Sequence, residues 1–595
     1  MIYTFAFMFL LAVRSARSQQ DVHRVQCDYG DTSCRCNESA TACEFNLRVS
    51  YLQTFTRYPV RNQTDISDLD GVVHRINASG DVVSYDGNIY EDGYTEAATV
   101  DGKTFRAFIA VNGRSPGPTL IVSEGQTVIV NVRNEMRGQS ITIHWHGQLL
   151  KDTPWMDGVG FITQCPLTTG GTFRYIFKAQ PSGTFWYHSH VDGQRGDGLL
   201  GALIVLERDA DATYFDLPGQ HTLVLQDWWP QPFIDLFTVM HSVGKTYYPS
   251  MVGVLPTHAY SVSILPDGSV HGSIPFFSGL INGLGKHSDV PYESSRLASF
   301  QVTYGNKYRF LVIGGQMLYG YKVSVDRHKL TVISTDGFLI RPVSDVDYII
   351  VYPGERYDFV LTADQIPTRY YWIRAETLEV NTTAFGPPYP SLGNSVQAVL
   401  YYSNATKPTS KDYSTIESTS RSCTQSAPCI AVNCPFQDFH ESYNVTCINV
   451  GALQLLKPSS NESLPSNDPT GSQEHFLNFG YSGLDGMLPD NINGRSFMHP
   501  PAPLQLQSFD ITDLTCPTEP YSCGEGCRCL HMLTIPYNNT VRLVLANLGR
   551  ESHAIHLHGH SYYVLAVGYG SYESSSGFVS TLHNSTLEDR STTLG

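Results

Sequence analysis

Short runs of apolar residues, bounded by Gly, Pro, Asn and Asp, recur along the whole chain. Three of them have the length and composition of β-strands: Thr127–Val132, Lys307–Val312 and Thr540–Leu545. Val, Tyr, Phe and Thr, which favour strands, are frequent, whereas stretches with the period of a long helix are scarce. The pattern therefore predicts an all-β protein.

A turn signal precedes each of these strands. Asn112-Gly113, Asn282-Gly283 and Asn493-Gly494 each follow an aliphatic residue. Asn and Gly both tolerate a positive φ, so the pair is typical of a tight turn. Because the same turn and strand recur at long intervals, the sequence predicts three copies of one β-sandwich domain.

The length of 595 residues is enough for three or four domains. The apolar run Ile2–Ala12, followed by small residues, predicts a secretory signal that is cleaved near Ser18. The chain becomes polar and rich in Ser, Pro, Asn and Cys between the second and third copies, which predicts a linker. The expected segments are a signal at 1–18, a Cys-rich extension at 19–93, domain 1 at 94–207, domain 2 at 208–403, a disulfide-tied linker at 404–474 and domain 3 at 475–595.

Twelve of the 13 cysteines fall into three clusters, and Cys165 lies apart from them. In a secreted protein such clusters predict disulfides, and an odd total leaves one thiol over or bridged to another chain. Zinc binding is the alternative, although the regular gaps and neighbouring histidines of zinc modules are absent. The glycosylation signals, Asn-x-Ser/Thr, are at Asn37, Asn62, Asn77, Asn381, Asn404, Asn444, Asn461, Asn538 and Asn584.

The formal net charge of −16 argues against nucleic acid and anionic membranes as partners. The apolar run at the start of the chain is too short to span a bilayer, and no later run reaches about 18 apolar residues. We therefore expect a secreted, extracellular protein without a membrane span.

Histidines are paired at a spacing of two in three places: His144 and His146, His188 and His190, and His556 and His558. Side chains two apart on a strand point to the same face, roughly 7 Å from each other. That spacing suits two metal ions side by side better than one ion, and imidazole suits copper or zinc. The alternative is that each pair belongs to an ordinary strand, but all three pairs have apolar or aromatic neighbours.

The residues around these pairs resemble the multicopper oxidase family, in particular its laccase-like members of the animal type. His-Trp-His-Gly at 144–147, Trp-Tyr-His-Ser-His at 186–190 and His-x-x-His-x-His-Gly-His at 553–560 resemble three of the family's four copper motifs. The resemblance runs from about Ala107 to Val567 and includes Pro353–Asp358. It implies three tandem cupredoxin-like Greek-key β-sandwich domains, with the third incomplete at its C-terminal end.

The resemblance also implies a role for each histidine. His144 and His556 correspond to the type 2 copper ligands, His146 and His188 to ligands of one type 3 copper, His190 and His558 to ligands of the other, and His553 to a ligand of the type 1 copper. Asp157 matches an acidic residue that assists proton delivery near the cluster, and a plain Asp-Gly turn is the alternative.

The implied activity is the one-electron oxidation of phenols or aromatic amines, coupled to the four-electron reduction of dioxygen to water. Ferrous iron and ascorbate are further substrates within the family. The fourth motif, His-Cys-His-x-x-x-His, is absent, and no Cys follows Cys529. We therefore expect an incomplete type 1 site and a third domain without its last strands. A fragment, a gene-model error and a short isoform all remain open, and the alternative function is copper binding without oxidase activity.

Overall fold

The computed structural model describes most of the chain. The described residues are 21–53, 75–76, 82–83, 100–104, 106–207, 217, 219–236, 263–266, 270–271, 274–292, 295–383, 386, 388–434, 439–456, 473–480, 491–505, 511–517, 528–547, 553–565, 569–573, 577–581 and 592–594. The predicted signal, four of the nine glycosylation signals (at Asn62, Asn77, Asn461 and Asn584), Cys523 and Cys527 lie outside them. Nearly all regular structure in the described residues is β-sheet, and none of their helices is long and apolar enough to cross a membrane.

Domain 1 is a sandwich of two five-stranded sheets. One has the order β1-β3-β8-β10 with β6 on β3, and the other has the order β2-β7-β12-β11-β9. The strands are β1 (Val22–Arg24), β2 (Ser33–Arg35), β3 (Ala42–Gln53), β6 (Ala107–Val111), β7 (Gly117–Ser123), β8 (Thr127–Asn134), β9 (Ile143–His146), β10 (Thr172–Lys178), β11 (Gly183–Ser189) and β12 (Leu200–Leu206). Side chains from both sheets, among them Phe45, Val130 and Trp145, form one core.

The segment expected to be a separate extension contributes strands to this sandwich. β3 pairs in parallel with β8, and β2 pairs in parallel with β7. Alternate residues of β3, including Phe45, Leu47 and Val49, are fully buried in the domain 1 core. Disulfides Cys27–Cys34 and Cys36–Cys43 hold the segment together. Its apolar alternation therefore explains why it folds onto domain 1.

Domain 2 is a sandwich of two seven-stranded sheets, with the orders β17-β16-β13-β19-β24-β21-β22 and β18-β26-β25-β20-β23-β27-β28. The strands are β13 (Gln220–Trp228), β16 (Ser278–Ile281), β17 (Leu284–Gly285), β18 (Ser299–Val302), β19 (Lys307–Gly314), β20 (Tyr321–Val325), β21 (Leu330–Thr335), β22 (Phe338–Val346), β23 (Tyr348–Val351), β24 (Arg356–Thr362), β25 (Tyr370–Thr377), β26 (Ser395–Tyr402), β27 (Cys429–Val432) and β28 (Val445–Ile448).

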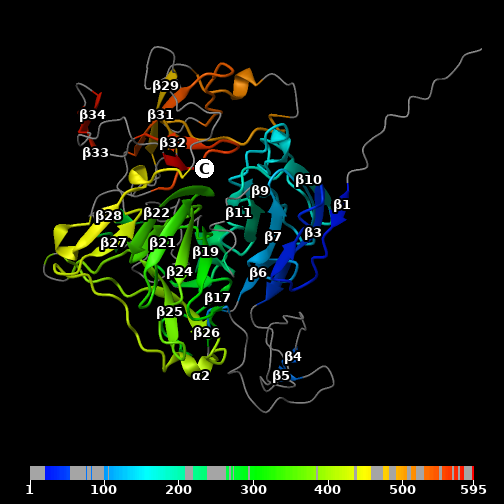
Figure 1. Cartoon of the computed structure of the whole chain (residues 1–595). Helices are drawn as coiled ribbons and strands as arrows, with labels where there is room; N and C mark the ends of the chain where they lie inside the picture. Colours follow the sequence, from blue (N-terminus) through cyan, green and yellow to red (C-terminus); the bar gives the residue numbers. More distant parts are fainter. Residues whose placement is uncertain are drawn as a thin grey trace, which may run out of the picture.

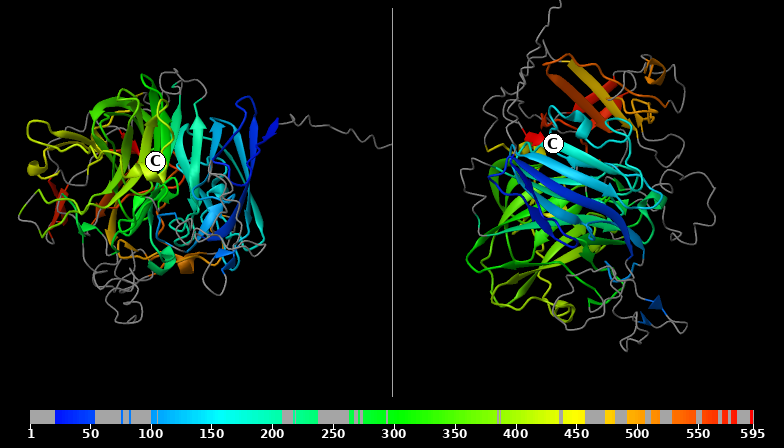
Figure 2. Two further views of the ribbon diagram at one scale, coloured as in Figure 1. Left: turned by 90° about the horizontal axis from the view of Figure 1, so that it is seen from below. Right: turned by 90° about the vertical axis from the view of Figure 1, so that its right-hand side faces the viewer.

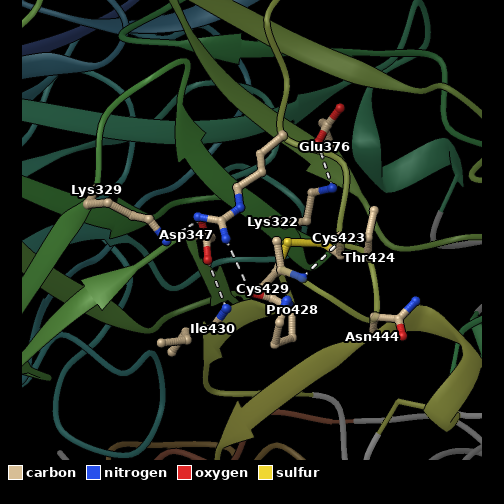
Figure 3. Close-up of a disulfide and its surroundings, with 12 residues drawn as sticks. Lys322, Lys329, Asp347, Glu376, Cys423, Thr424, Pro428, Cys429, Ile430 and Asn444 are labelled. Carbon is tan, nitrogen blue, oxygen red and sulfur yellow. Dashed lines mark hydrogen bonds and ion pairs between the residues drawn. A yellow bond between two sulfur atoms is a disulfide. The ribbon is translucent and has the colours of Figure 1, made fainter.

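The last two strands of domain 2 come from the segment expected to be a linker. Disulfides Cys423–Cys429 and Cys434–Cys447 tie this segment together. Figure 3 shows the first of them beside Asp347, which accepts a hydrogen bond of 2.8 Å from the Ile430 main-chain N–H. Lys329 Nζ lies 2.7 Å from the same carboxylate. The linker is thus fixed to domain 2 before it continues to domain 3.

Domain 3, coloured orange and red in Figure 1, packs against both other domains (Figures 1 and 2). Its described strands are β29 (Gln473–Gly480), β30 (Asn491–Ile492), β31 (Val541–Asn547), β32 (Tyr562–Val564), β33 (Tyr569–Glu573), β34 (Gly577–Thr581) and β35 (Thr592–Leu594). They form a three-stranded sheet, β30-β29-β31, and two separate strand pairs.

The three predicted Asn-Gly turns are confirmed. Both residues of each pair have a positive φ, from 49° at Asn112 to 79° at Gly283. The predicted strands at 127–132, 307–312 and 540–545 are present as β8, β19 and β31.

Candidate metal centre

The register between β9 and β11 brings histidines to one face of domain 1. His144 lies opposite His188, and His146 lies opposite Trp186. Because side chains alternate along each strand, Trp145 turns into the domain 1 core and the paired histidines face outwards from that core. His144, His146 and His188 are nonetheless buried, since domains 2 and 3 cover this face (Figure 1), whereas His190, just past the end of β11, is exposed.

The third histidine motif reaches the same place from domain 3. His144 Nε2 lies 3.2 Å from His556 Nε2, across 412 positions of sequence. The rings of His146 and His556 stack with centroids 3.8 Å apart, and the ring of His558 lies 4.0 Å from that of His144 and 5.0 Å from that of His190. Six of the seven predicted ligands therefore lie in one cluster of imidazoles.

The structure differs from the sequence-based expectation in two ways: the conformation of the third histidine motif, and the distance between ligand atoms of a histidine pair. Residues 553–558 form a loop rather than a strand, and Gly559 follows with φ of +69°. The ligand atoms of His144, His146 and His556 lie within 4.8 Å of one another, so a pair from one strand can share an ion. The ring nitrogens of His144 and His146 therefore lie closer together than the separation of roughly 7 Å expected for side chains two residues apart on a strand. His553 is half-buried and belongs to neither group of described residues able to hold one ion.

Hydrogen bonds fix the ring tautomers. The Nδ1–H of His188 donates to the Ser189 carbonyl over 2.8 Å, and that of His144 donates to the Asp157 carbonyl over 2.9 Å. The Nδ1–H of His558 donates to the Asp157 carboxylate over 2.8 Å. Each of these rings therefore presents the lone pair of Nε2 to the cluster, as metal-binding histidines do.

Burial and neighbouring charges keep four of the clustered imidazoles neutral. Burial is the largest cause that lowers the pKa values of His144, His146 and His188, and the charges of neighbouring rings lower these pKa values further. Burial, followed by the charges of neighbouring imidazoles, likewise lowers the pKa of His556. Neutral imidazole is the form that binds a metal ion.

Asp157 lies directly beside the cluster. Its carboxylate is 3.1 Å from His144 Nδ1 and 2.8 Å from His558 Nδ1. Burial raises the pKa of Asp157, but the hydrogen bonds from His144 and His558 outweigh burial and hold the pKa well below its usual range. Asp157 and His558 also line a cavity of about 1,340 Å³ between the domains.

The donor set fits copper. The buried atoms His188 Nε2 and His556 Nδ1 have no hydrogen-bond partner among the described residues. Buried polar atoms are normally hydrogen-bonded, so buried ring nitrogens without a partner in a group of imidazoles are the expected state of ligands to an ion. Imidazole ligands suit copper as well as zinc.

Sequence reasoning assigned no role to Arg356, which lies next to the cluster. Its positive charge acts on both His146 and His556. Arg356 belongs to the motif at 353–358, and its place in that motif was the only available signal.

A β-sandwich protein in which imidazoles from separate domains gather at one place belongs to the class of metal-binding proteins. Three sequence profiles described as multicopper oxidase match residues 94–210, 219–404 and 498–592. The chain belongs to the multicopper oxidase family and is a copper-dependent oxidoreductase.

Its relatives include laccases of fungi. Laccase-2 of Fomitopsis schrenkii is 30% identical over 472 residues, which cover 77% of this chain and 74% of the relative. Laccase-4 of Trametes villosa is 29% identical over 517 residues, covering 84% and 81%.

Solved structures have the same fold. Laccase from Botrytis aclada has a TM-score of 0.55 at 20% identity, covering 91% of this chain and 81% of that one. Fet3p, described as a multicopper oxidase that functions in iron import, has a TM-score of 0.54 at 18% identity, covering 93% and 82%. The arrangement of domains in this chain is therefore that of a multicopper oxidase.

Proposed function

We propose that this protein is a secreted, laccase-like oxidase that couples one-electron oxidation of phenolic or aromatic amine substrates to the reduction of dioxygen to water. One observation carries the proposal. Imidazoles from domain 1 and from domain 3, 412 positions apart, place two ring nitrogens 3.2 Å from each other.

In this proposal six histidines hold copper. His144 and His556 supply the type 2 ligands, and His146, His188, His190 and His558 supply type 3 ligands. Copper, when bound, supplies the one-electron steps and the binding of dioxygen. The domain boundaries at 94–207, 208–403 and 475–595 stay part of the proposal, with residues 21–53 adding strands to domain 1 and residues 429–448 of the linker adding strands to domain 2.

The protein's own residues would hold and move protons around this centre. Asp157 is ionised at neutral pH and accepts a hydrogen bond from the Nδ1–H of His558. It thereby orients that ring. Because the carboxylate also lines the cavity between the domains, it would accept hydrogen bonds from water there and so order a water path along which protons reach the cluster.

The type 1 centre requires a thiolate. Among the described residues, ten cysteines form five disulfides and Cys165 is an exposed thiol in domain 1. We propose that residues 1–595 on their own bind copper at the histidine cluster without the blue absorption of a type 1 centre. His553 would be one of the ligands of that centre in a chain that also contains the His-Cys-His motif.

The disulfides and the laccase relatives support a secreted protein. Partners on this view are dioxygen and a small aromatic reductant.

The test is copper binding by the whole chain and by two variants. Purified protein is loaded with copper, dialysed and analysed for metal content and for its electron paramagnetic resonance (EPR) spectrum. His144→Ala and His556→Ala should each lose most of the bound copper. His221→Ala, in domain 2 away from the cluster, should keep it. Copper content that is unchanged in both cluster variants would disprove the assignment. In a chain that includes the fourth motif, the same two variants should abolish oxygen consumption with a diphenol.

A further inference from the structure

The turn at residues 352–356 of domain 2 has no predicted metal ligand but packs against the cluster. A methyl group placed on Gly354 would lie 3.5 Å from His146 Cε1, which is ordinary contact distance. The turn of domain 2 therefore lies about one methyl group away from the ring of a candidate ligand of domain 1. Arg356 is the last residue of this turn and the first of β24.

The guanidinium of Arg356 is buried and held on several sides. Its Nη1 donates to the Gly354 carbonyl over 2.9 Å and lies 3.0 Å from the Asp336 carboxylate. Its Nη2 donates to the Asp336 carbonyl over 3.1 Å. Its Nε donates over 3.3 Å to the carbonyl of Thr184, which belongs to β11 of domain 1. Arg356 therefore spans the boundary between the two domains.

The same guanidinium fills the space beside the residue that follows His146. A methyl group on Gly147 would lie 2.4 Å from the Phe185 ring and 2.8 Å from Arg356 Nη2. Gly147 has φ of +89°, which other residues adopt only with strain. Phe185 and Arg356 thus leave no room for a side chain at the residue after His146.

Two further contacts hold this region in place. The hydroxyl of Thr184 donates over 2.8 Å to Asp358, which lies two residues after Arg356. Asn433, from the linker, donates over 2.7 Å to Glu355, which lies one residue before it. The turn is therefore fixed to domain 1 on one side and to the linker on the other.

We propose that Arg356 is a positioning residue of the cluster, which holds the end of β9 so that the ring of His146 stays against that of His556. This inference rests on the proposed function, since it assigns a role towards the same centre. A planar guanidinium can make these bonds together, whereas a lysine can keep the charge but not the set of directed bonds.

The competing view is that Arg356 only stabilises domain 2, as any buried arginine–aspartate pair would. The chain contains a matched pair for comparison. Arg374 bonds to Asp326 through Nε at 2.7 Å and Nη2 at 2.9 Å, is buried to a similar degree, and lies in domain 2 without contact to the clustered histidines in the described structure. Loss of either pair should destabilise the fold to a similar extent.

The experiment uses metal-free whole chain and labels histidines with diethylpyrocarbonate, which acylates accessible neutral imidazoles. Labelled residues are located by mass spectrometry of peptides. His146 is 5% exposed and should be protected in the wild type and in Arg374→Gln. In Arg356→Gln and Arg356→Lys its labelling should rise at least several-fold at equal overall folding, as judged by circular dichroism. A second readout is copper binding. The affinity for copper is expected to fall about 10- to 100-fold in both Arg356 variants.

Equal protection of His146 in Arg356→Lys and Arg374→Gln would overturn the inference, as would equal copper retention in these two variants. If Arg356→Gln does not fold, Arg356→Lys carries the comparison alone, because it keeps a charge opposite Asp336. The labelling result does not depend on metal. A wild type that binds no copper would therefore refute the proposed function, while the labelling still decides whether Arg356 positions His146.

Discussion

Acid should destabilise the metal-free protein from about pH 6.5 downwards, because the cluster holds its imidazoles neutral. His144, His146 and His188 are between 1% and 5% exposed, and burial lowers the pKa of each. In the unfolded chain a histidine has a pKa of about 6.5. Below that pH the unfolded state binds protons that the folded state does not, so stability present above pH 6.5 is lost as the pH falls.

The magnitude follows from proton linkage. Each such histidine lowers the free energy of unfolding by up to about 1.4 kcal/mol per pH unit, so three give up to about 4 kcal/mol per unit. Asp157 affects the free energy of unfolding in a different pH range. Because its folded pKa lies below its usual value, its stabilising effect is lost only below about pH 4.

The assay is urea unfolding of the metal-free chain between pH 7.5 and 5.5. His146→Gln removes one titrating group, so its free energy of unfolding should fall by about 1.4 kcal/mol less than that of the wild type across this range, or about 0.7 kcal/mol less per pH unit on average. His440→Ala, which removes an exposed histidine of the linker, is the control and should keep the wild-type slope. A wild-type stability that does not change across this range, or an identical slope in His146→Gln, would refute the account of a neutral, buried cluster.

Three further outcomes can be measured on the same chain. Asp157→Asn keeps the shape of the side chain but removes its charge. The affinity for copper should fall about 10- to 100-fold, while the circular dichroism spectrum stays unchanged. Unchanged affinity would show that the carboxylate does not orient the cluster. Gly147→Ala should lower the free energy of unfolding by at least about 1–3 kcal/mol, because the added methyl group would meet Phe185 at 2.4 Å and the backbone has φ of +89°. An unchanged thermal midpoint would contradict this close packing. Replacing both Cys434 and Cys447 by Ser opens a loop with a sequence separation of 13 and should cost about 3 kcal/mol in urea unfolding; no loss would mean that the linker is held by β27 and β28 alone.

The sequence predicted those parts of the structure that depend on local spacing. The Asn-Gly turns and the strands after them are local patterns, and alternation within a strand is enough to place His144 and His146 on one face. The motif resemblance added the expectation that domains 1 and 3 share a centre. The contact between His144 and His556 agrees with that expectation.

Other features depend on partners far away in the sequence and have no local signature. The alternation in β3 predicts a strand but does not reveal that it pairs with β8. Residues 553–558 carry the same spacing as a strand pair yet form a loop, because the positions of His556 and His558 are set by contacts with domain 1. The nearness of Arg356 to the cluster follows from the packing of two domains, which no spacing within domain 2 encodes.

The two sides of the cluster differ in how they are held. His144 and His188 lie on paired strands inside a packed sandwich, so the domain 1 face exists before any ion binds. His556 and His558 lie on a loop, which is held by a bond from the Tyr562 hydroxyl to the Ile555 carbonyl over 2.8 Å and by the His558–Asp157 contact. Fewer contacts fix the loop than the strands, and regions with few fixing contacts open first. Copper release should therefore begin on the domain 3 side, with hydrogen exchange at residues 553–560 preceding exchange in β9 and β11 as metal is removed.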